Sequence, residues 1–281
     1  MKKKVALLLL LVFLMVFVAF AGCKKKEEEK NELDIIKEKG YITVAISPDF
    51  APYEFENLNA EDGQTVVGCE VELAKYIAEY LGVELKIESM DFSSCQAAVQ
   101  SGTVDFSVSG YAITEDRQKT YNMTEPYKWQ DDSTGQLIIV KKDEVEKYAT
   151  ADSFSGKKVA AQNGSLQMSL VEEQLPEDIT IEPISTLNDG ILSLINDKID
   201  CMACAGDTAL QYVKNYPDKL AIAAFKFEYT SKGNSALIMK GNDALLAAIN
   251  EAIQAAVKEG KLPVWREEAV ALAESLGIEN N

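Results

Sequence analysis

The hydrophobic pattern of this chain switches repeatedly between the period of a strand and the period of a helix. Residues 41–46 are rich in β-branched side chains, which predicts a strand. In residues 70–81 the apolar side chains recur at helical spacing and the run ends at Gly82, so we expect an amphipathic helix there. Residues 83–87 then alternate as a half-buried strand does. Such alternation predicts open α/β sheets, which bind ligands at the carboxyl ends of their strands.

The same alternation of strands and helices continues to the C-terminus. Further strands are expected from 104 to the turn at Gly110 and at 136–140, 158–161, 179–184, 199–204 and 234–239. Further helices are expected at 93–100, 166–175, 187–196, 243–259 and 264–276.

Two stretches of the chain resemble each other. Residues 96–112 align without gaps to residues 191–207, and each contains an apolar helix, a polar turn, an Asp and a strand. We interpret the two aspartates, Asp105 and Asp200, as structural. The repeat predicts two similar α/β lobes that face one another across a cleft.

The stretch 104–117 combines a strand, a glycine turn and the start of a helix. Thr114 is a good N-cap, and the acids after it suit the first helical turn. The unpaired backbone N–H groups of such a turn form an anion site, to which Arg117 adds a planar fork that grips a carboxylate with two hydrogen bonds. The alternative is a capped helix whose Arg117 pairs with a neighbouring acid.

The N-terminus has the pattern of a targeting segment. Three lysines precede an apolar run from 5 to 20, which is short for a membrane span, so residues 1–22 are interpreted as a signal peptide. Cys23 follows Ala-Gly and resembles the lipidated cysteine of a lipoprotein signal, although Phe20 stands where Leu is usual. The alternative is an uncleaved membrane anchor. Residues 23–32 are charged and are expected to form a solvated tether.

The composition of the chain argues against several classes of function. The chain has 28 basic and 45 acidic residues and a formal net charge of −17, so it is a poor candidate for binding nucleic acid. It contains no His, which excludes Ser-His-Asp and Cys-His catalysis and the commonest metal ligand.

Cys201 and Cys204 have the spacing of a redox or zinc pair. They lie within an apolar run that is typical of a buried strand, where residues three apart point to opposite faces. We therefore expect two buried free thiols and predict no metal site and no cofactor.

Five short motifs occur in the order found in a known protein family: 47–55 (SPDFAPYEF), 68–74 (GCEVELA), 90–92 (MDF), 110–117 (GYAITEDR) and 124–127 (TEPY). With the lipoprotein signal, they resemble the polar amino-acid-binding proteins of ABC importers, the family-3 extracellular solute-binding proteins. The resemblance covers residues 33–277.

The resemblance implies a periplasmic-binding-protein-like type II fold, with two α/β lobes joined by two hinge strands that close on a ligand. It implies a first lobe formed by 33–127 and 231–281, a second lobe at 136–227, and hinge segments at 128–135 and 228–230.

The resemblance also implies roles for residues around an α-amino acid. The ligand carboxylate would bind Arg117 and the backbone near Gly110 and Ala112, with further N–H groups from Ser165 and Leu166 in the second lobe.

The ammonium of an α-amino acid needs a carboxylate, and we choose Asp207. The family usually places this Asp where the chain has Ala205, so the choice requires a two-residue bulge. The alignment of Ala112 with Asp207 in the internal repeat supports it. Asp49, Glu54 and Asp189 are the next candidates.

Phe50 and Phe92 would pack on the ligand side chain, and Gln162 would tune specificity. Binders of cationic amino acids tend to carry an acid where this chain has Ser47, so an uncharged polar amino acid is expected.

The leading function is therefore a monomeric binding protein, not an enzyme. It would be anchored at the extracytoplasmic face of the cell membrane by lipidated Cys23 and deliver an amino acid to an ABC permease. The alternatives are a ligand-sensing module with a separate signalling partner and a periplasmic dehydratase-like enzyme.

Overall fold

The computed structural model describes residues 30–60, 63, 65–129 and 134–277. The predicted signal peptide and its Cys23 lie outside these residues. None of the helices in the described part is long and apolar enough to cross a bilayer.

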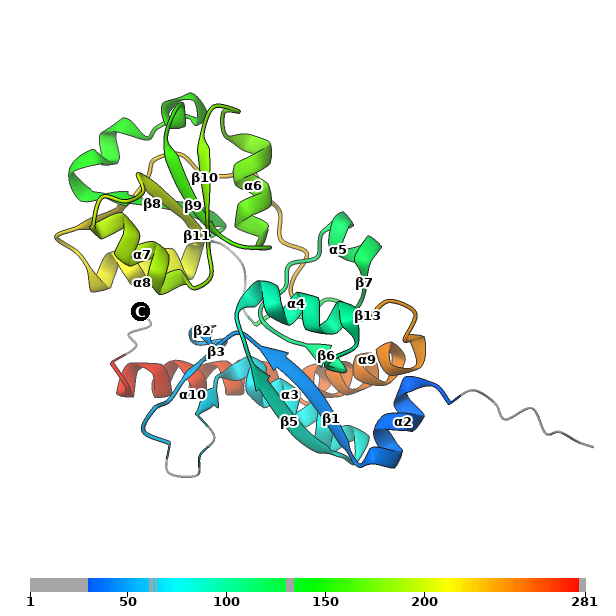
Figure 1. The fold of residues 1–281 in the computed structure, drawn as a ribbon. Coiled ribbons are helices and arrows are strands. Elements are labelled where there is room, and N and C mark those ends of the chain that lie inside the picture. Colours follow the sequence, from blue (N-terminus) through cyan, green and yellow to red (C-terminus); the bar gives the residue numbers. More distant parts are fainter. Residues whose placement is uncertain (1–29, 61–62, 64, 130–133, 278–281) are drawn as a thin grey trace, which may run out of the picture. The chain divides into compact units, whose positions relative to one another are not determined.

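The first lobe is built on a mixed sheet in the strand order β5-β1-β6-β13-β7 (Figure 1). The strands β5 and β6 run parallel to β1, and β13 runs antiparallel to β6 and β7. The sheet strands are β1 Tyr41–Ile46, β5 Glu84–Ser89, β6 Phe106–Ser107, β7 Tyr121–Met123 and β13 Leu237–Met239. The helices of this lobe are α2 Glu32–Lys39, α3 Cys69–Leu81, α4 Phe92–Ser101, α5 Glu115–Thr120, α9 Asp243–Lys258 and α10 Lys261–Ser275.

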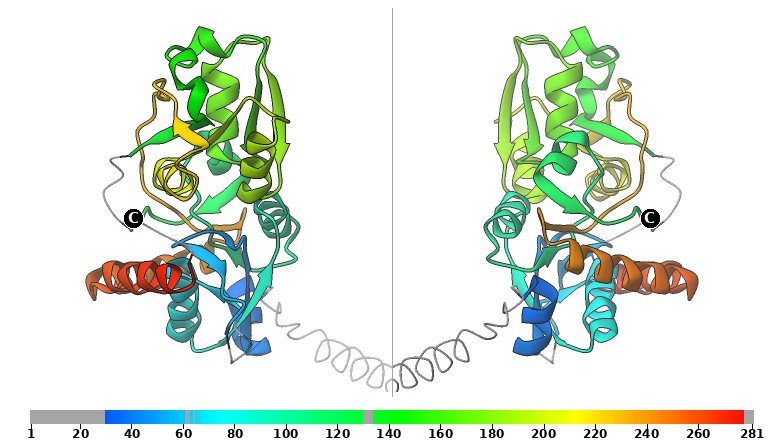
Figure 2. Two further views of the ribbon diagram at one scale, coloured as in Figure 1. Left: turned by 90° about the vertical axis from the view of Figure 1, so that its left-hand side faces the viewer. Right: turned by 90° about the vertical axis from the view of Figure 1, so that its right-hand side faces the viewer.

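Helices cover both faces of the first sheet. Side chains alternate across β1, so Val44 joins a buried cluster with α3, α9 and α10, whereas Ala45 joins a second cluster with α4. The helices α3, α9 and α10 pack against one another, as the side views show (Figure 2). This sandwich fixes the ends of β1 and β6, from which the loops toward the second lobe leave.

A small antiparallel sheet extends the first lobe and holds the predicted 47–55 motif. It consists of β2 Asp49–Phe50, β3 Glu54–Glu56 and β4 Val66–Val67, with Phe50 paired to Glu54. The start of α3 lies tightly against it, because the backbone N–H of Glu70 donates to the Tyr53 carbonyl at 2.9 Å. Gly68 permits this approach, since a Cβ there would lie 2.2 Å from the Tyr53 oxygen. Glu54 and Glu70 are thereby held close together.

The second lobe is built on a sheet in the order β10-β9-β11-β8-β12. The strands β10 and β11 run parallel to β9, and β8 runs antiparallel to β11 and β12. The strands are β8 Gln136–Lys141, β9 Lys158–Gln162, β10 Thr180–Ile184, β11 Cys201–Ala205 and β12 Leu220–Ile222. The helices are η1 Lys142–Lys147, η2 Ala151–Phe154, α6 Leu166–Gln174, α7 Leu187–Ile195 and α8 Gly206–Asn215.

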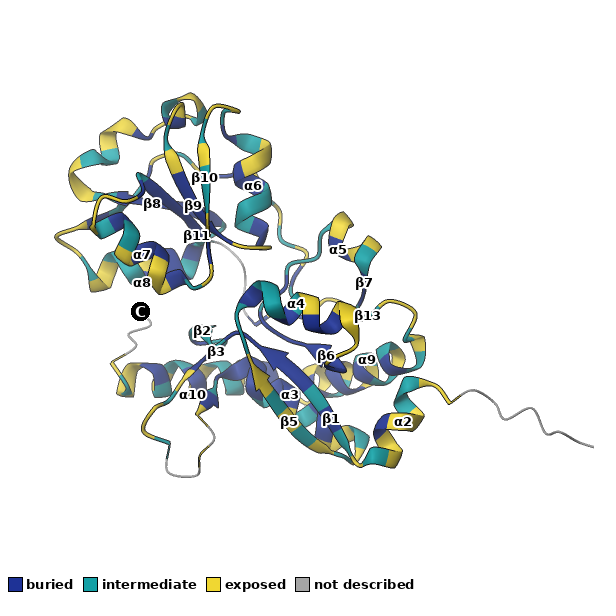
Figure 3. Cartoon of the chain, viewed as in Figure 1, coloured by how far each residue is buried: buried dark blue, intermediate teal, exposed yellow. Residues whose placement is uncertain are grey.

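The central strands of the second sheet are buried on both faces (Figure 3). Cys201 packs in a cluster with α6, and Cys204 packs in a different cluster with α7 and α8. The strand interpretation of the Cys-x-x-Cys segment is therefore confirmed, and both cysteines are buried free thiols. Their distribution over opposite faces leaves them no shared metal or disulfide.

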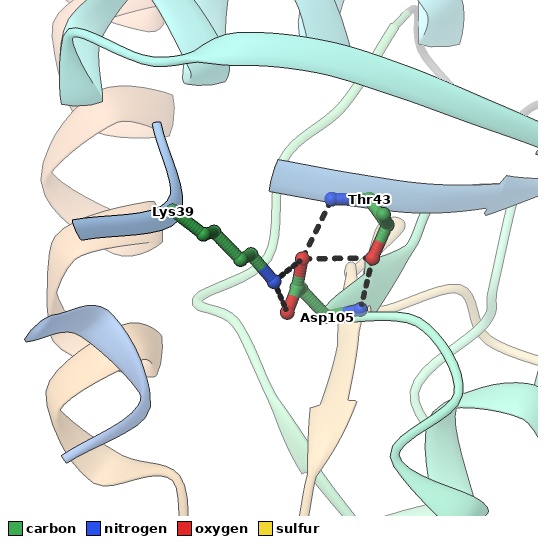
Figure 4. Close-up of polar contacts among 3 residues, drawn as sticks. All are labelled: Lys39, Thr43 and Asp105. Carbon is green, nitrogen blue, oxygen red and sulfur yellow. Dashed lines mark hydrogen bonds and ion pairs between the residues drawn. The ribbon is translucent and has the colours of Figure 1, made fainter. Parts of the chain in front are cut away.

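The two sheets repeat one topology, and the predicted structural aspartates confirm the internal repeat. Asp105, just before β6, accepts hydrogen bonds from the Thr43 backbone N–H at 2.6 Å and from its hydroxyl at 2.7 Å, and from Lys39 (Figure 4). Asp200, just before β11, accepts from the Lys158 backbone N–H at 2.8 Å. Each aspartate thus binds the start of the neighbouring parallel strand.

The structure corrects the sequence predictions near position 207. The predicted bulge is absent, because β11 keeps regular register with β8 from Cys201–Val140 to Ala205–Gln136. An unpredicted helix, α8, begins at Gly206 and places Asp207 in its first turn. The sequence predictions also placed the start of α10 three residues late, at Val264 rather than Lys261.

Candidate functional site

A cavity lies between residues of the two lobes. It has about 430 Å³ of empty space, and we call it the Glu54 cavity. The first lobe contributes the small-sheet residues Asp49, Phe50 and Glu54, together with Phe92 and Ser109. The second lobe contributes Gln162, Ser165, Gln167, Leu187, Ala203, Cys204 and Ala205. Of the described residues that line it, none is basic, so its charged groups are carboxyls.

The cavity brings together Phe50, Phe92, Gln162 and Ser165, all of which the sequence predicted as ligand contacts. The ring of Phe50 also packs against the apolar cluster of the second lobe. The turn at Gly110, with φ of 61°, lies directly behind Phe50, since a Cβ at this glycine would lie 3.0 Å from the Phe50 ring. Gly110 thus supports the cavity wall.

Asp49 joins the two lobes at one edge of this cavity. Its Oδ2 accepts a hydrogen bond from Gln162 Nε2 at 2.9 Å and another from the Leu187 backbone N–H at 3.0 Å. Leu187 is the first residue of α7, where the helix dipole favours a negative charge. The Ser47 hydroxyl donates to the other carboxyl oxygen at 3.1 Å. Burial raises the pKa of Asp49 against these hydrogen bonds, which lower it.

Glu54 is the most deeply buried acid in the cavity wall, with 1% of its surface exposed. Its Oε2 is buried and has no hydrogen-bond partner in the described part of the chain. Burial raises the pKa of Glu54 well above its ordinary value, and the neighbouring charges of Glu70 and Asp49 raise it further. A hydrogen bond from Ser109 opposes this shift.

Glu70 is a neighbour of Glu54, and both of its carboxyl oxygens accept hydrogen bonds. It accepts from Tyr127 Oη at 2.9 Å and from Trp129 Nε1 at 2.8 Å. Burial raises the pKa of Glu70 to about 7 in spite of these hydrogen bonds. Glu70 thus fixes the side chains of Tyr127 and Trp129, near the end of the described part of the first lobe.

Arg117 occupies a second position between the lobes. It is 8% exposed, and Thr114 caps its helix as predicted, with the Thr114 hydroxyl accepting from the Arg117 backbone N–H. Its guanidinium donates to the Ala112 carbonyl and to the Gly164 carbonyl of the second lobe, each at 2.9 Å. Among the described residues it forms no ion pair, so the alternative of pairing with a neighbouring acid is not what the structure shows.

The guanidinium of Arg117 borders an adjacent hollow of about 820 Å³, which we call the Arg117 cavity. Leu166 lines this cavity, and Ser165 lines both it and the Glu54 cavity. Gln96 Nε2 also donates to the Gly164 carbonyl at 3.2 Å. The predicted carboxylate site and the Glu54 cavity are therefore neighbours that share Ser165.

Asp207 lies in another hollow, of about 610 Å³, on the side of the chain passages between the lobes. The hydroxyl of Thr134 donates to its carboxylate. This hollow shares Phe50 and Ala205 with the Glu54 cavity, but Asp207 itself does not line that cavity. The role of Asp207 toward an ammonium group stays a prediction.

Sequence reasoning ranked Asp49 and Glu54 behind Asp207, although the structure places both in the cavity wall. The signal that could have raised them is their position within the 47–55 motif, next to Phe50. Ala205, which stands where the family places its acid, lines the cavity without a charge. Within the described ranges, no group of three or more His, Cys, Asp or Glu side chains is arranged to hold a metal.

Comparisons with known proteins agree with this architecture. Residues 42–268 match the family model of bacterial extracellular solute-binding proteins, family 3. The chain is 28% identical over 212 residues to the arginine-binding extracellular protein ArtP of Bacillus subtilis (strain 168), covering 75% of this chain and 77% of ArtP. It is 29% identical over 227 residues to the L-cystine-binding protein TcyJ of Escherichia coli (strain K12), covering 79% of this chain and 81% of TcyJ.

Solved structures give the same result. The amino acid ABC transporter substrate-binding protein AbpA from Streptococcus pneumoniae Canada MDR_19A, bound to L-arginine, superposes with a TM-score of 0.75. It is 33% identical, over 84% of this chain and 97% of AbpA. These similarities confirm the two-lobe type II fold and the prediction of a binding protein rather than an enzyme. The chain belongs to the bacterial extracellular solute-binding proteins of family 3.

Proposed function

We propose that this protein binds an α-amino acid between its lobes and delivers it to an ABC permease. The observation that carries the proposal is the presence, beside a cavity with two carboxyls in its wall, of a buried Arg117 whose guanidinium donates to backbone carbonyls rather than to an acid. A zwitterion needs a partner for each sign of charge, and each lobe supplies part of the contacts. The arginine- and cystine-binding names of the relatives support the same class of ligand.

In this proposal Arg117 binds the ligand carboxylate, together with N–H groups near Gly110, Ala112, Ser165 and Leu166. A guanidinium that donates to two backbone carbonyls can exchange one of them for a carboxylate, which is a stronger acceptor. The predicted segments 128–135 and 228–230 act as hinges.

For the ammonium group, the sequence proposes Asp207, whereas the cavity offers Asp49 and Glu54 beside Gln162 and Ser165. Phe50 and Phe92 supply the apolar walls for the ligand side chain.

The chemical class of the side chain has two candidates. The sequence proposes an uncharged polar amino acid, because Ser47 replaces an acid that binders of cationic amino acids tend to carry. The structure favours a second candidate, a cationic amino acid, because Asp49 and Glu54 line a cavity without a basic residue. The arginine bound to AbpA supports this second candidate.

The N-terminal pattern completes the proposal. We propose that Cys23 is lipidated and holds a monomeric protein at the extracytoplasmic face of the cell membrane, where it meets the permease. A ligand sensor with a separate signalling partner would use the same lobes and the same cavity.

A thermal-shift screen of the twenty amino acids tests the proposed function. A ligand that binds the folded state alone stabilises it by about 2.7 kcal/mol at one hundred times its Kd. For a chain of this size we therefore expect a rise in Tm of about 5–10 °C for the physiological ligand. A flat screen, with no amino acid raising Tm at millimolar concentration, would contradict the proposal. A rise for L-glutamine alone supports the uncharged class, and a rise for L-arginine or L-lysine alone supports the cationic class.

A further inference from the structure

The environment of Glu54 has a consequence for how the ligand binds. The carboxyl is 1% exposed, its Oε2 lacks a hydrogen-bond partner in the described part of the chain, and it lines the cavity. An ionised carboxylate in such a place is far more costly than a neutral carboxyl, and the charges that act on Glu54 are those of other acids. Burial and the unpartnered oxygen therefore favour the protonated form of Glu54 in the free protein.

The groups that face Glu54 reinforce this state. The paired strand β2 contributes Asp49, and the first turn of α3 contributes Cys69 and Glu70. The other packed elements contribute the thiol of Cys95 and the phenols of Tyr111 and Tyr127. The nearby cation Arg266 of α10 acts on Cys69 and Tyr53, but it is not among the charges that shift the pKa of Glu54.

A ligand brings the cation that this carboxyl lacks. We propose that Glu54 is protonated in the free protein and binds the cationic group of the ligand as a carboxylate, so that each binding event releases a proton to the solvent. The O–H bond of the Glu54 carboxyl breaks, the proton passes to the buffer, and the carboxylate oxygen accepts a hydrogen bond from the ligand ammonium or guanidinium. No other bond changes.

This inference rests on the proposed function and adds proton release to it. The sign follows from linkage. Because binding lowers the pKa of Glu54 from its raised value in the free protein, affinity increases as pH rises toward that value. It does so by up to about tenfold per pH unit. Above the raised pKa the proton is already lost in the free protein, and the dependence on pH disappears.

Calorimetric titration in two buffers of different ionisation enthalpy, such as phosphate and Tris at the same neutral pH, measures the protons released. The probes are L-arginine, which carries a side-chain cation, and L-glutamine, whose only cation is its α-ammonium. We expect a net release of protons on binding in the parent protein and loss of that release in Glu54→Gln. The net release is less than one proton per ligand, because the coupled Glu70 takes up part of the charge change. Glu56→Gln, an exposed acid on the same strand β3, is the matched control and should behave as the parent.

The outcomes separate the inference from the function. Proton release on binding L-glutamine would show that Glu54 binds the ligand α-ammonium. Proton release with L-arginine alone would show that Glu54 binds the side-chain cation. Tight binding without proton release, or the same release in Glu54→Gln as in the parent, overturns the inference and leaves the proposed function intact. If neither probe binds, the inference fails for both cations, and the thermal-shift screen of all amino acids decides whether the proposed function fails with it.

Discussion

Arg117→Ala is expected to lower the affinity for the amino acid by about 2–5 kcal/mol, the range for truncating one member of a buried charge pair. The guanidinium is buried, and its partners in the structure are the Ala112 and Gly164 carbonyls rather than an acid. Truncation therefore leaves no buried carboxylate without a partner in the ligand-free fold, although it removes two hydrogen bonds and the contacts of the guanidinium with Phe92 and Tyr111. Calorimetry should show the loss of affinity, and circular dichroism should show that the free protein is still folded.

Two further variants sharpen this test. Arg117→Lys should recover only part of the affinity, because an ammonium cannot reproduce the planar fork. Lys119→Ala removes an exposed cation from the same helix, α5, and should bind as the parent does. Parent-like affinity in Arg117→Ala would show that the ligand carboxylate binds elsewhere.

Asp49→Asn is expected to lower the affinity by about 1.5–3 kcal/mol, the contribution of a hydrogen bond to a charged group. Asp49 Oδ2 is the shared acceptor for Gln162 Nε2 and the Leu187 N–H, so it connects the small sheet of the first lobe to α7 of the second. Weakening this connection disfavours the arrangement in which Gln162 and Phe50 line one cavity, and the apparent affinity falls with the population of that arrangement. We expect most of the change in the dissociation rate.

A double-mutant cycle separates this role from a direct contact with the ligand. Asp49→Asn and Gln162→Ala should be coupled by at least about 0.5 kcal/mol, as residues in one hydrogen-bond network are. Asp189→Asn, an exposed acid in the first turn of α7, is the matched control. Strictly additive losses for Asp49→Asn and Gln162→Ala would contradict the connecting role of Asp49.

Much of the fold could be predicted, because the hydrophobic pattern along the sequence and the internal repeat indicate the same strands and helices. The strand at 41–46 and the helix ending at Gly82 follow from periodicity and a glycine stop, both of which act locally. The structural role of Asp105 and Asp200 followed from their equivalent places in the repeat. Helix α8 was missed because its first residue is Gly206, a residue that usually ends helices rather than beginning them.

The site was harder to predict, because its contacts join residues far apart in the chain. The Thr114 cap of Arg117 is local and was predicted, whereas the Gly164 carbonyl that Arg117 binds comes from the other lobe. The burial of Glu54 is also invisible in sequence. Strand alternation gives Glu54 and Glu56 the same face, yet Glu54 is buried in the cavity wall and Glu56 is exposed. Tertiary packing, not local pattern, decides which acid meets the ligand.

Small-angle scattering shows directly whether the two lobes close on a ligand bound between them. The parent protein is measured without ligand and at saturation with the amino acid that raises Tm most in the screen. We expect a smaller radius of gyration with ligand, because each lobe alone supplies only part of the contacts and the closed arrangement is favoured when both are engaged. An unchanged radius of gyration at proven saturation would contradict closure.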